Sequence, residues 1–137
     1  MWNVYPDSTG NWLLTMIDGR RFIKSFKHAF DGIHHAFKND QNLLVHLMVA
    51  FIVINASIAL HVSGYEMGIL GLTIMMVIMA EMVNSAIERM VDLITKEHRI
   101  EAKIAKDVAA GMVLLTAIAA MIIGSLIFLP YILKLFH

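Results

Sequence analysis

The sequence predicts an all-α integral membrane protein, and three observations support this fold class. Hydrophobic residues make up 58% of the chain and charged residues only 16%. With a mean hydropathy of +0.69, the chain is too apolar for a soluble domain of 137 residues. Three apolar stretches each supply the roughly 20 residues that a hydrocarbon core of about 30 Å requires. This length has room for one domain, which we expect at residues 20–137 after a tail at residues 1–19.

The expected tail contains no Lys or Arg, and a turn-like Pro-Asp-Ser-Thr-Gly run interrupts it. It therefore lacks the basic start and the continuous apolar core of a signal peptide. Trp2, Tyr5 and Trp12 are typical of side chains that rest at the headgroup level of a membrane. A poorly ordered tail is the equal alternative.

Residues 20–39 have the pattern of an amphipathic helix. Apolar side chains recur at spacings of 4, 4, 3 and 4 on one helical face, namely Phe22, Phe26, Phe30, Ile33 and Phe37. A basic helix rich in Phe predicts a position in the membrane interface. We expect it to precede three transmembrane helices, at residues 43–62, at 67–95 including a cytoplasmic extension, and at 108–129.

The Lys and Arg residues predict the orientation in the membrane. Five precede the first span, namely Arg20, Arg21, Lys24, Lys27 and Lys38, and five lie between the second and third spans, namely Arg89, Lys96, Arg99, Lys103 and Lys106. The connection at 63–66 has none, and only Lys134 follows the third span. Because cytoplasmic loops carry the excess of Lys and Arg, we expect a cytoplasmic N-terminus and an external C-terminus.

Polar side chains form a stripe on the second span. Glu81, Asn84, Glu88 and Asp92 lie 0, 3, 7 and 11 residues along the helix, so they point within about 60° of one direction. If hydrocarbon ends near Ile87, Glu81 lies about 9 Å inside it. Ionisable groups at that depth cost about 2.5–3.5 kcal/mol each on insertion scales and mark a functional site by default. The stripe predicts a site at the cytoplasmic face, where a lipid headgroup and a soluble molecule can meet.

Charge and motif content narrow the chemistry. The formal net charge is zero and cysteine is absent, so nothing predicts nucleic-acid binding or thiolate chemistry. The sequence has neither a GxxxxGKS/T P-loop nor a GxGxxG motif. Phosphoryl transfer would then need metal-bridged carboxylates together with Lys or Arg. Glu88 and Asn84 offer hard oxygen ligands for Mg²⁺, and the segment EHRIEAKIAKD brings cations close to the start of the third span, where a helix N-terminus favours anions.

The segment AEMVNSAIERMVDLIT, followed after a short loop by AKDVAAGMVLLTA, resembles the prokaryotic diacylglycerol kinase family of small three-span lipid kinases. The resemblance covers about Arg21 to Phe128 and is strongest to the Gram-positive branch, whose members typically phosphorylate undecaprenol. It implies a homotrimeric bundle with shared active sites in the bacterial inner (cytoplasmic) membrane. It also implies a γ-phosphate transfer from Mg-ATP to a lipid alcohol, with undecaprenol as the favoured acceptor and diacylglycerol as the alternative.

The resemblance also implies roles for single residues. Glu81 matches the general base that takes the proton from the lipid hydroxyl as it attacks the γ-phosphate. The metal-binding positions correspond to Asp40, Glu88 and Asn84. The nucleotide-contacting positions correspond to Arg21, His28, Asp40, Glu88, Glu97, His98, Arg99, Lys106 and Asp107. The substrate-contacting positions correspond to Arg21, Glu81 and Ala110.

Three positions depart from the family's pattern. Asp40 replaces the usual Glu and is one methylene shorter, so coordination through a bridging water is an alternative to direct metal binding. His28 stands where an aromatic residue is often found, and Leu44 replaces a common Arg. Asn42 and His46 fit the Gram-positive pattern, although His46 alone reads as a packing residue.

Other interpretations stay open beside these roles. Glu81 would otherwise be a buried polar contact, Asp92 a solvated helix end, Lys106 a membrane anchor and Asp107 the N-cap of the third span. A different class of function is a non-enzymatic oligomer that conducts protons or other ions along the stripe. Conduction needs polar groups through the whole bilayer depth, whereas residues 67–79 offer only Thr73, which favours the kinase.

Overall fold

The computed structural model describes residues 19–97 and 99–135, and the regular secondary structure in these ranges is helical. The helices are α2 (Gly19–Asn39), α3 (Gln41–Ala59), α4 (Gly64–Ile94) and α5 (Ile100–Leu135). The chain divides into two compact units between Lys38 and Asn39, so α2 belongs to the first unit apart from its last residue, and α3–α5 form the second. The expected tail lies outside the described residues, except for Gly19.

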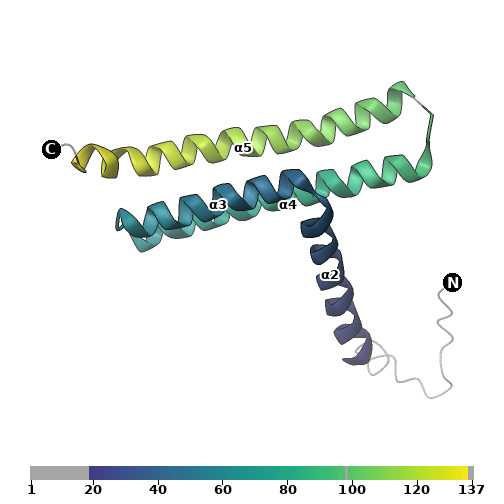
Figure 1. The fold of residues 1–137 in the computed structure, drawn as a ribbon, viewed down its shortest axis with the longest axis horizontal. Coiled ribbons are helices and arrows are strands. Elements are labelled where there is room, and N and C mark those ends of the chain that lie inside the picture. Colours follow the sequence, from purple (N-terminus) through teal and green to yellow (C-terminus); the bar gives the residue numbers. More distant parts are fainter. Residues whose placement is uncertain (1–18, 98, 136–137) are drawn as a thin grey trace, which may run out of the picture. The chain divides into compact units, whose positions relative to one another are not determined.

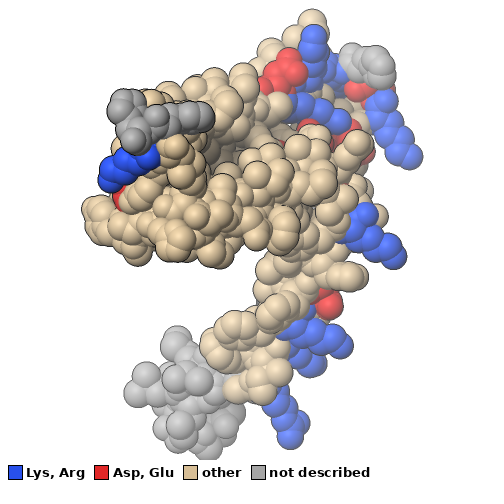
Figure 2. Space-filling model, turned by 60° about the vertical axis from the view of Figure 1, so that its left-hand side comes forward, with Lys and Arg blue, Asp and Glu red and all other residues tan. Residues whose placement is uncertain are grey.

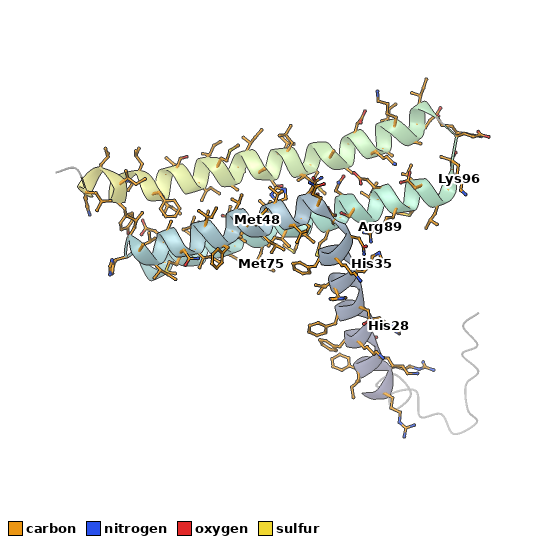
Figure 3. All side chains as sticks on the ribbon, viewed as in Figure 1. His28, His35, Met48, Met75, Arg89 and Lys96 are labelled. Carbon is orange, nitrogen blue, oxygen red and sulfur yellow. The ribbon has the colours of Figure 1, made fainter. Side chains whose placement is uncertain are left out.

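The helix α2 has an exposed apolar face. Phe22, Phe26 and Phe30 are all solvent-exposed, and the rings of Phe22 and Phe26 meet edge to face with their centroids 4.9 Å apart. His28 and His35 also lie on this helix (Figure 3). An amphipathic helix with an exposed aromatic face is the pattern of a helix that lies in a membrane interface.

Each helix of the three-helix unit is long and apolar enough to cross a membrane, and the three run alongside one another (Figure 1). At 1.5 Å per residue, the 19 residues of α3 span about 28 Å, the 31 of α4 about 46 Å and the 36 of α5 about 54 Å. A hydrocarbon core is about 30 Å thick, so α4 and α5 extend well beyond it. This confirms the prediction of an all-helical protein with three candidate membrane spans.

The third of these helices begins earlier than the sequence predicts. α5 starts at Ile100 rather than near Val108, and it continues through Pro130 to Leu135. The early start has a physical reason, because Ala, Glu and Lys, which favour helices, fill much of residues 101–106. Lys106 and Asp107 therefore lie inside the helix. The interpretation of Asp107 as the N-cap of the third span is wrong.

One end of the three-helix unit holds its apolar core. Val62, Leu70 and Ile127 form a buried cluster from the α3–α4 turn, from α4 and from α5, and other apolar side chains pack against it. Along its length, α4 contacts both α3 and α5. α4 is therefore the central helix of the unit, and the residues on its packed face are positioned by two neighbours.

A hydrogen-bond network, the Glu66–Tyr131 clasp, ties the same end together. Ser63 and Glu66 form a capping box at the start of α4, in which the Ser63 hydroxyl accepts from the Glu66 N–H and Glu66 Oε2 accepts from the Ser63 N–H. The Tyr131 hydroxyl on α5 donates to the same Glu66 oxygen at 2.5 Å. The Ser63 N–H also donates to the Tyr131 oxygen at 3.2 Å. The clasp thus joins the α3–α4 turn to the last turns of α5.

Candidate active site

Glu81 is a buried carboxylate in the middle of α4. Only 2% of the residue is exposed, and its Oε1 atom has no hydrogen-bond partner among the described residues. Asp40, Asn42 and Glu88 lie near enough to act electrostatically on its carboxylate. A buried carboxylate oxygen without a hydrogen-bond donor lowers the stability of the fold. Glu81 is therefore the strongest candidate for a group that binds a proton or a ligand.

Asn84 and Glu88 extend the site along α4. Asn84 is 4% exposed, and its Nδ2 donates to Glu88 Oε1 at 3.1 Å. This bond orients the amide, yet Asn84 Oδ1 is left without a partner in the described part of the chain. Two buried acceptor oxygens, on Glu81 and Asn84, therefore lie one helical turn apart on the predicted stripe.

Asp40 connects the start of α3 to α4. Its backbone is extended, and its side chain caps α3 by accepting from the N–H groups of Asn42 at 3.1 Å and Leu43 at 3.3 Å. Its other oxygen, Oδ2, accepts a hydrogen bond from the Ser85 hydroxyl on α4. Three protein donors thus engage Asp40, two at Oδ1 and one at Oδ2, which leaves one lone pair of Oδ2 for a further ligand.

The residues of this cluster fit a magnesium ion. Among the described residues, no group of three His, Cys, Asp or Glu side chains is placed to hold a metal. Mg²⁺, however, usually binds through one or two carboxylates and takes its other ligands from water and phosphate. The Glu88 carboxylate beside the unpartnered Asn84 oxygen offers that kind of donor set.

A charged pocket follows at the end where α4 meets α5. It has a volume of about 590 Å³ and is lined by charged side chains from both helices and their connection, namely Asp92, Lys96, Glu97, Arg99, Lys103, Lys106 and Asp107. Lys106 Nζ contacts Asp92 Oδ1 at 2.5 Å, and Arg99 pairs with Glu97 at 2.8 Å. Arg89 and Lys96 lie at this end of α4 (Figure 3), and Figure 2 shows acidic and basic side chains gathered there.

The structure brings some predicted site residues together and leaves others apart. One cluster contains the predicted residues Asp40, Glu81, Asn84 and Glu88. The charged pocket is lined by the predicted residues Glu97, Arg99, Lys106 and Asp107. Ala110 is exposed on α5, one turn beyond Asp107. Arg21 and His28 belong to α2, which is a separate unit, so their roles stay predictions. His98 lies outside the described residues.

Sequence reasoning missed Ser85 and the Glu66–Tyr131 clasp. A signal existed for Ser85, because it lies four residues after Glu81 and therefore on nearly the same helical face. A signal also existed for half of the clasp, since Ser63 followed by Glu66 is the spacing of a capping box. Nothing in the sequence pairs Glu66 with Tyr131, which is 65 residues away.

The fold and the site together define a small multi-pass membrane protein whose buried acidic cluster leads along one helix to a charged pocket. The family model described as prokaryotic diacylglycerol kinase matches residues 27–128 of this chain. The chain therefore belongs to the prokaryotic diacylglycerol kinase family, which confirms the resemblance drawn from its motifs.

Two relatives carry names that state an activity. The chain is 42% identical to a diacylglycerol kinase of Synechocystis over 112 residues, which cover 81% of this chain and 64% of that protein. It is 43% identical to the undecaprenol kinase of Bacillus subtilis over 110 residues, which cover 80% of this chain and 89% of that protein. The chain thus spans less than two thirds of the Synechocystis protein. Both names are those of lipid kinases, and this chain is a member of a lipid kinase family.

Proposed function

We propose that the protein transfers the γ-phosphoryl group of ATP to the hydroxyl group of a lipid alcohol, with Glu81 as the general base and Mg²⁺ as cofactor. Undecaprenol is the favoured acceptor, and diacylglycerol is the alternative; the two relatives carry one name each. The observation that carries the proposal is the buried Glu81 carboxylate, whose Oε1 has no hydrogen-bond partner within residues 19–97 and 99–135. A general base on the membrane-spanning part of a helix can contact the hydroxyl of a membrane lipid, which a water-soluble kinase cannot reach.

On the lipid side, Glu81 accepts the proton of the acceptor hydroxyl through its unpartnered oxygen. The hydroxyl oxygen then forms a bond to the γ-phosphorus, the bond to the bridging oxygen of ATP breaks, and ADP leaves. Asn42, at the start of α3, lies near the same carboxylate. Because Glu81 is almost fully buried, water has little access to the base, which disfavours hydrolysis of ATP in place of lipid phosphorylation.

On the nucleotide side, Glu88 and Asn84 would hold Mg²⁺, with Asp40 contributing directly or through a water. When bound, the ion neutralises charge on the phosphate oxygens. The cations of the charged pocket, including Arg99 and Lys106, supply further positive charge for the phosphates. The proposed nucleotide contacts also include Arg21, His28, Glu97, His98 and Asp107. Ala110 and Arg21 complete the proposed lipid contacts.

We further propose that the protein works as a homotrimer in the bacterial inner membrane, with the charged pocket on the cytoplasmic side. α3–α5 expose many large apolar side chains, more than a thin three-helix unit can cover by itself. The excess of Lys and Arg before α3 and after α4 supports a cytoplasmic position for the charged pocket by the positive-inside rule. A cytoplasmic pocket is where ATP is available.

A lipid phosphorylation assay with a matched pair of variants tests the proposed function. The purified protein in mixed micelles is expected to transfer labelled phosphate from Mg-ATP to undecaprenol, and Glu81→Gln is expected to reduce turnover by at least about 100-fold. Glu101→Gln is the control, since Glu101 lies on α5 outside both parts of the site. Wild-type turnover in Glu81→Gln would remove the base assignment, and absence of lipid phosphorylation with either acceptor would remove the proposed function.

Ion conduction receives no support from the apolar part of α4. Thr73 is the polar residue between Met67 and Met79, and its hydroxyl donates back to the Ile69 carbonyl at 2.8 Å. A hydroxyl bonded to its own helix offers no step in a polar path. Proton flux can be measured in liposomes that contain either the wild type or the Glu81→Gln variant. We expect the same flux in both, whereas a lower flux in the variant would favour conduction.

A further inference from the structure

We propose that Ser85 is a positioning residue for the general base, acting through Asp40 and the first turn of α3. This inference rests on the proposed role of Glu81. It starts from a single contact between two helices, in which the Ser85 hydroxyl on α4 donates to Asp40 Oδ2 at the start of α3. Neither the sequence motif nor the relatives' names assign a role to Ser85.

The first step concerns what Ser85 holds. Ser85 is buried, and its hydroxyl reaches across to another helix. Four other Ser and Thr hydroxyls of α3–α5 donate to backbone carbonyls of their own helices, namely those of Ser57, Thr73, Thr116 and Ser125. Ser85 differs from these four residues, because its hydroxyl joins α4 to the start of α3.

The second step concerns what Asp40 holds. While Oδ2 accepts from Ser85, Oδ1 accepts from the N–H groups of Asn42 and Leu43. An Asp in this position fixes the first turn of the helix. Leu43 has no exposed surface, so its side chain fixes the same turn by packing. The Ser85–Asp40 bond thus fixes the start of α3 against α4.

The third step reaches the base. Ser85 lies four residues, about one helical turn, after Glu81 on α4. The Ser85–Asp40 bond therefore holds the start of α3 against the part of α4 that carries the base. A base must be held within a fraction of an ångström of its productive geometry, since a displacement of about 1 Å can cost about 100-fold in rate. Fixing α3 against this part of α4 keeps the Glu81 carboxylate in place.

The test combines kinetics with amide hydrogen exchange in the full-length protein. Ser85→Ala is expected to lower kcat by about tenfold or more with little change in the KM for ATP, and to speed exchange of the Asn42 and Leu43 amides. Ser85→Thr, which retains the hydroxyl, is expected to restore both. The control is Ser57→Ala, which removes a buried hydroxyl bonded only within its own helix. It should change neither readout.

The outcomes separate this inference from the proposed function. Unchanged kcat and unchanged exchange in Ser85→Ala would overturn the positioning role while the wild type still phosphorylates lipid. Faster exchange with unchanged kcat would also overturn it, because the turn would then be loosened without effect on the base. If Ser85→Ala does not fold, Ser85→Cys retains a weak donor; values between wild type and inactive support the inference, and wild-type values overturn it.

Discussion

Lys106 on α5 and Asp92 on α4 are joined through an Nζ–Oδ1 contact of 2.5 Å, at the end of the unit opposite to its apolar core. Asp92 lies eleven residues beyond Glu81, about 16 Å along the helix axis. The contact therefore joins α4 to α5 inside the charged pocket. Asp92 is exposed near the end of α4, as a solvated helix end would be, and it also has a partner on another helix.

The two members of this pair are expected to differ in their effect on ATP binding. Lys106→Met should raise the KM for ATP by about 10- to 100-fold, because a hydrogen bond to a charged phosphate contributes about 1.5–3 kcal/mol. Asp92→Asn should not weaken ATP binding, since it removes a negative charge near the phosphates. Steady-state kinetics at saturating lipid measures both. Equal losses in the two variants would show that the pair serves only to join the helices.

The stability effect of the same pair is expected to be small. Both side chains are partly exposed, and exposed ion pairs contribute about 0.2–1 kcal/mol. The Lys106→Met variant should therefore unfold at nearly the same concentration of denaturing detergent as the wild type. A large loss of stability in this variant would contradict a role limited to ligand binding.

Glu88 is expected to set the magnesium requirement. Glu88→Gln should raise the Mg²⁺ concentration at half-maximal activity by about tenfold or more, because it removes the charged ligand while keeping an acceptor for the Asn84 amide. Direct Mn²⁺ binding, followed by electron paramagnetic resonance without ATP, gives a readout that does not depend on turnover. Glu101→Gln serves as the control. Wild-type Mn²⁺ affinity in Glu88→Gln would remove Glu88 from the metal site.

The packing of α3 on α4 gives a prediction on stability. Leu43 is fully buried and Leu44, its neighbour, is exposed. Leu43→Ala is expected to lower the free energy of unfolding by about 2–4 kcal/mol, through the cavity that it leaves, while Leu44→Ala should change it by less than about 1 kcal/mol. Unfolding by denaturing detergent compares the two. Similar losses in both variants would show that the α3–α4 contact is not where the structure places it.

The Glu66–Tyr131 clasp is expected to matter for stability and not for chemistry. Tyr131→Phe removes the hydroxyl that joins α5 to the α3–α4 turn, so the temperature of unfolding should fall by a few degrees. The kcat of the folded protein should remain at the wild-type value, because the clasp lies at the end away from Glu81. Thermal unfolding and turnover, measured on the same preparation, check the two parts. A loss of kcat with unchanged stability would contradict this separation.

Much of the fold follows from the sequence because membranes impose simple constraints. The length of an apolar run sets the existence of a span, and the 3.6-residue period places Glu81, Asn84 and Glu88 on one face. Helix ends were less predictable. The apolar pattern predicts that the third span begins at about Val108, and local helix propensity extends the helix α5 back to Ile100.

The site was predictable where it depends on one helix, and not where it depends on two. The spacing along α4 predicts Glu81 beside Asn84 and Glu88. No pattern in the sequence indicates that Ser85 meets Asp40, 45 residues away, or that Lys106 meets Asp92. These contacts depend on how the helices pack, which is a property of side-chain shapes along the whole interface.

The Val62–Leu70–Ile127 cluster lies apart from the acidic stripe, and this separation affects which side chains can be exchanged during evolution. The cluster lies at one end of α4, whereas the acidic stripe runs from the middle of α4 towards its other end. Exposed side chains around the stripe can therefore change, to suit another acceptor or nucleotide, without altering the packing of this cluster.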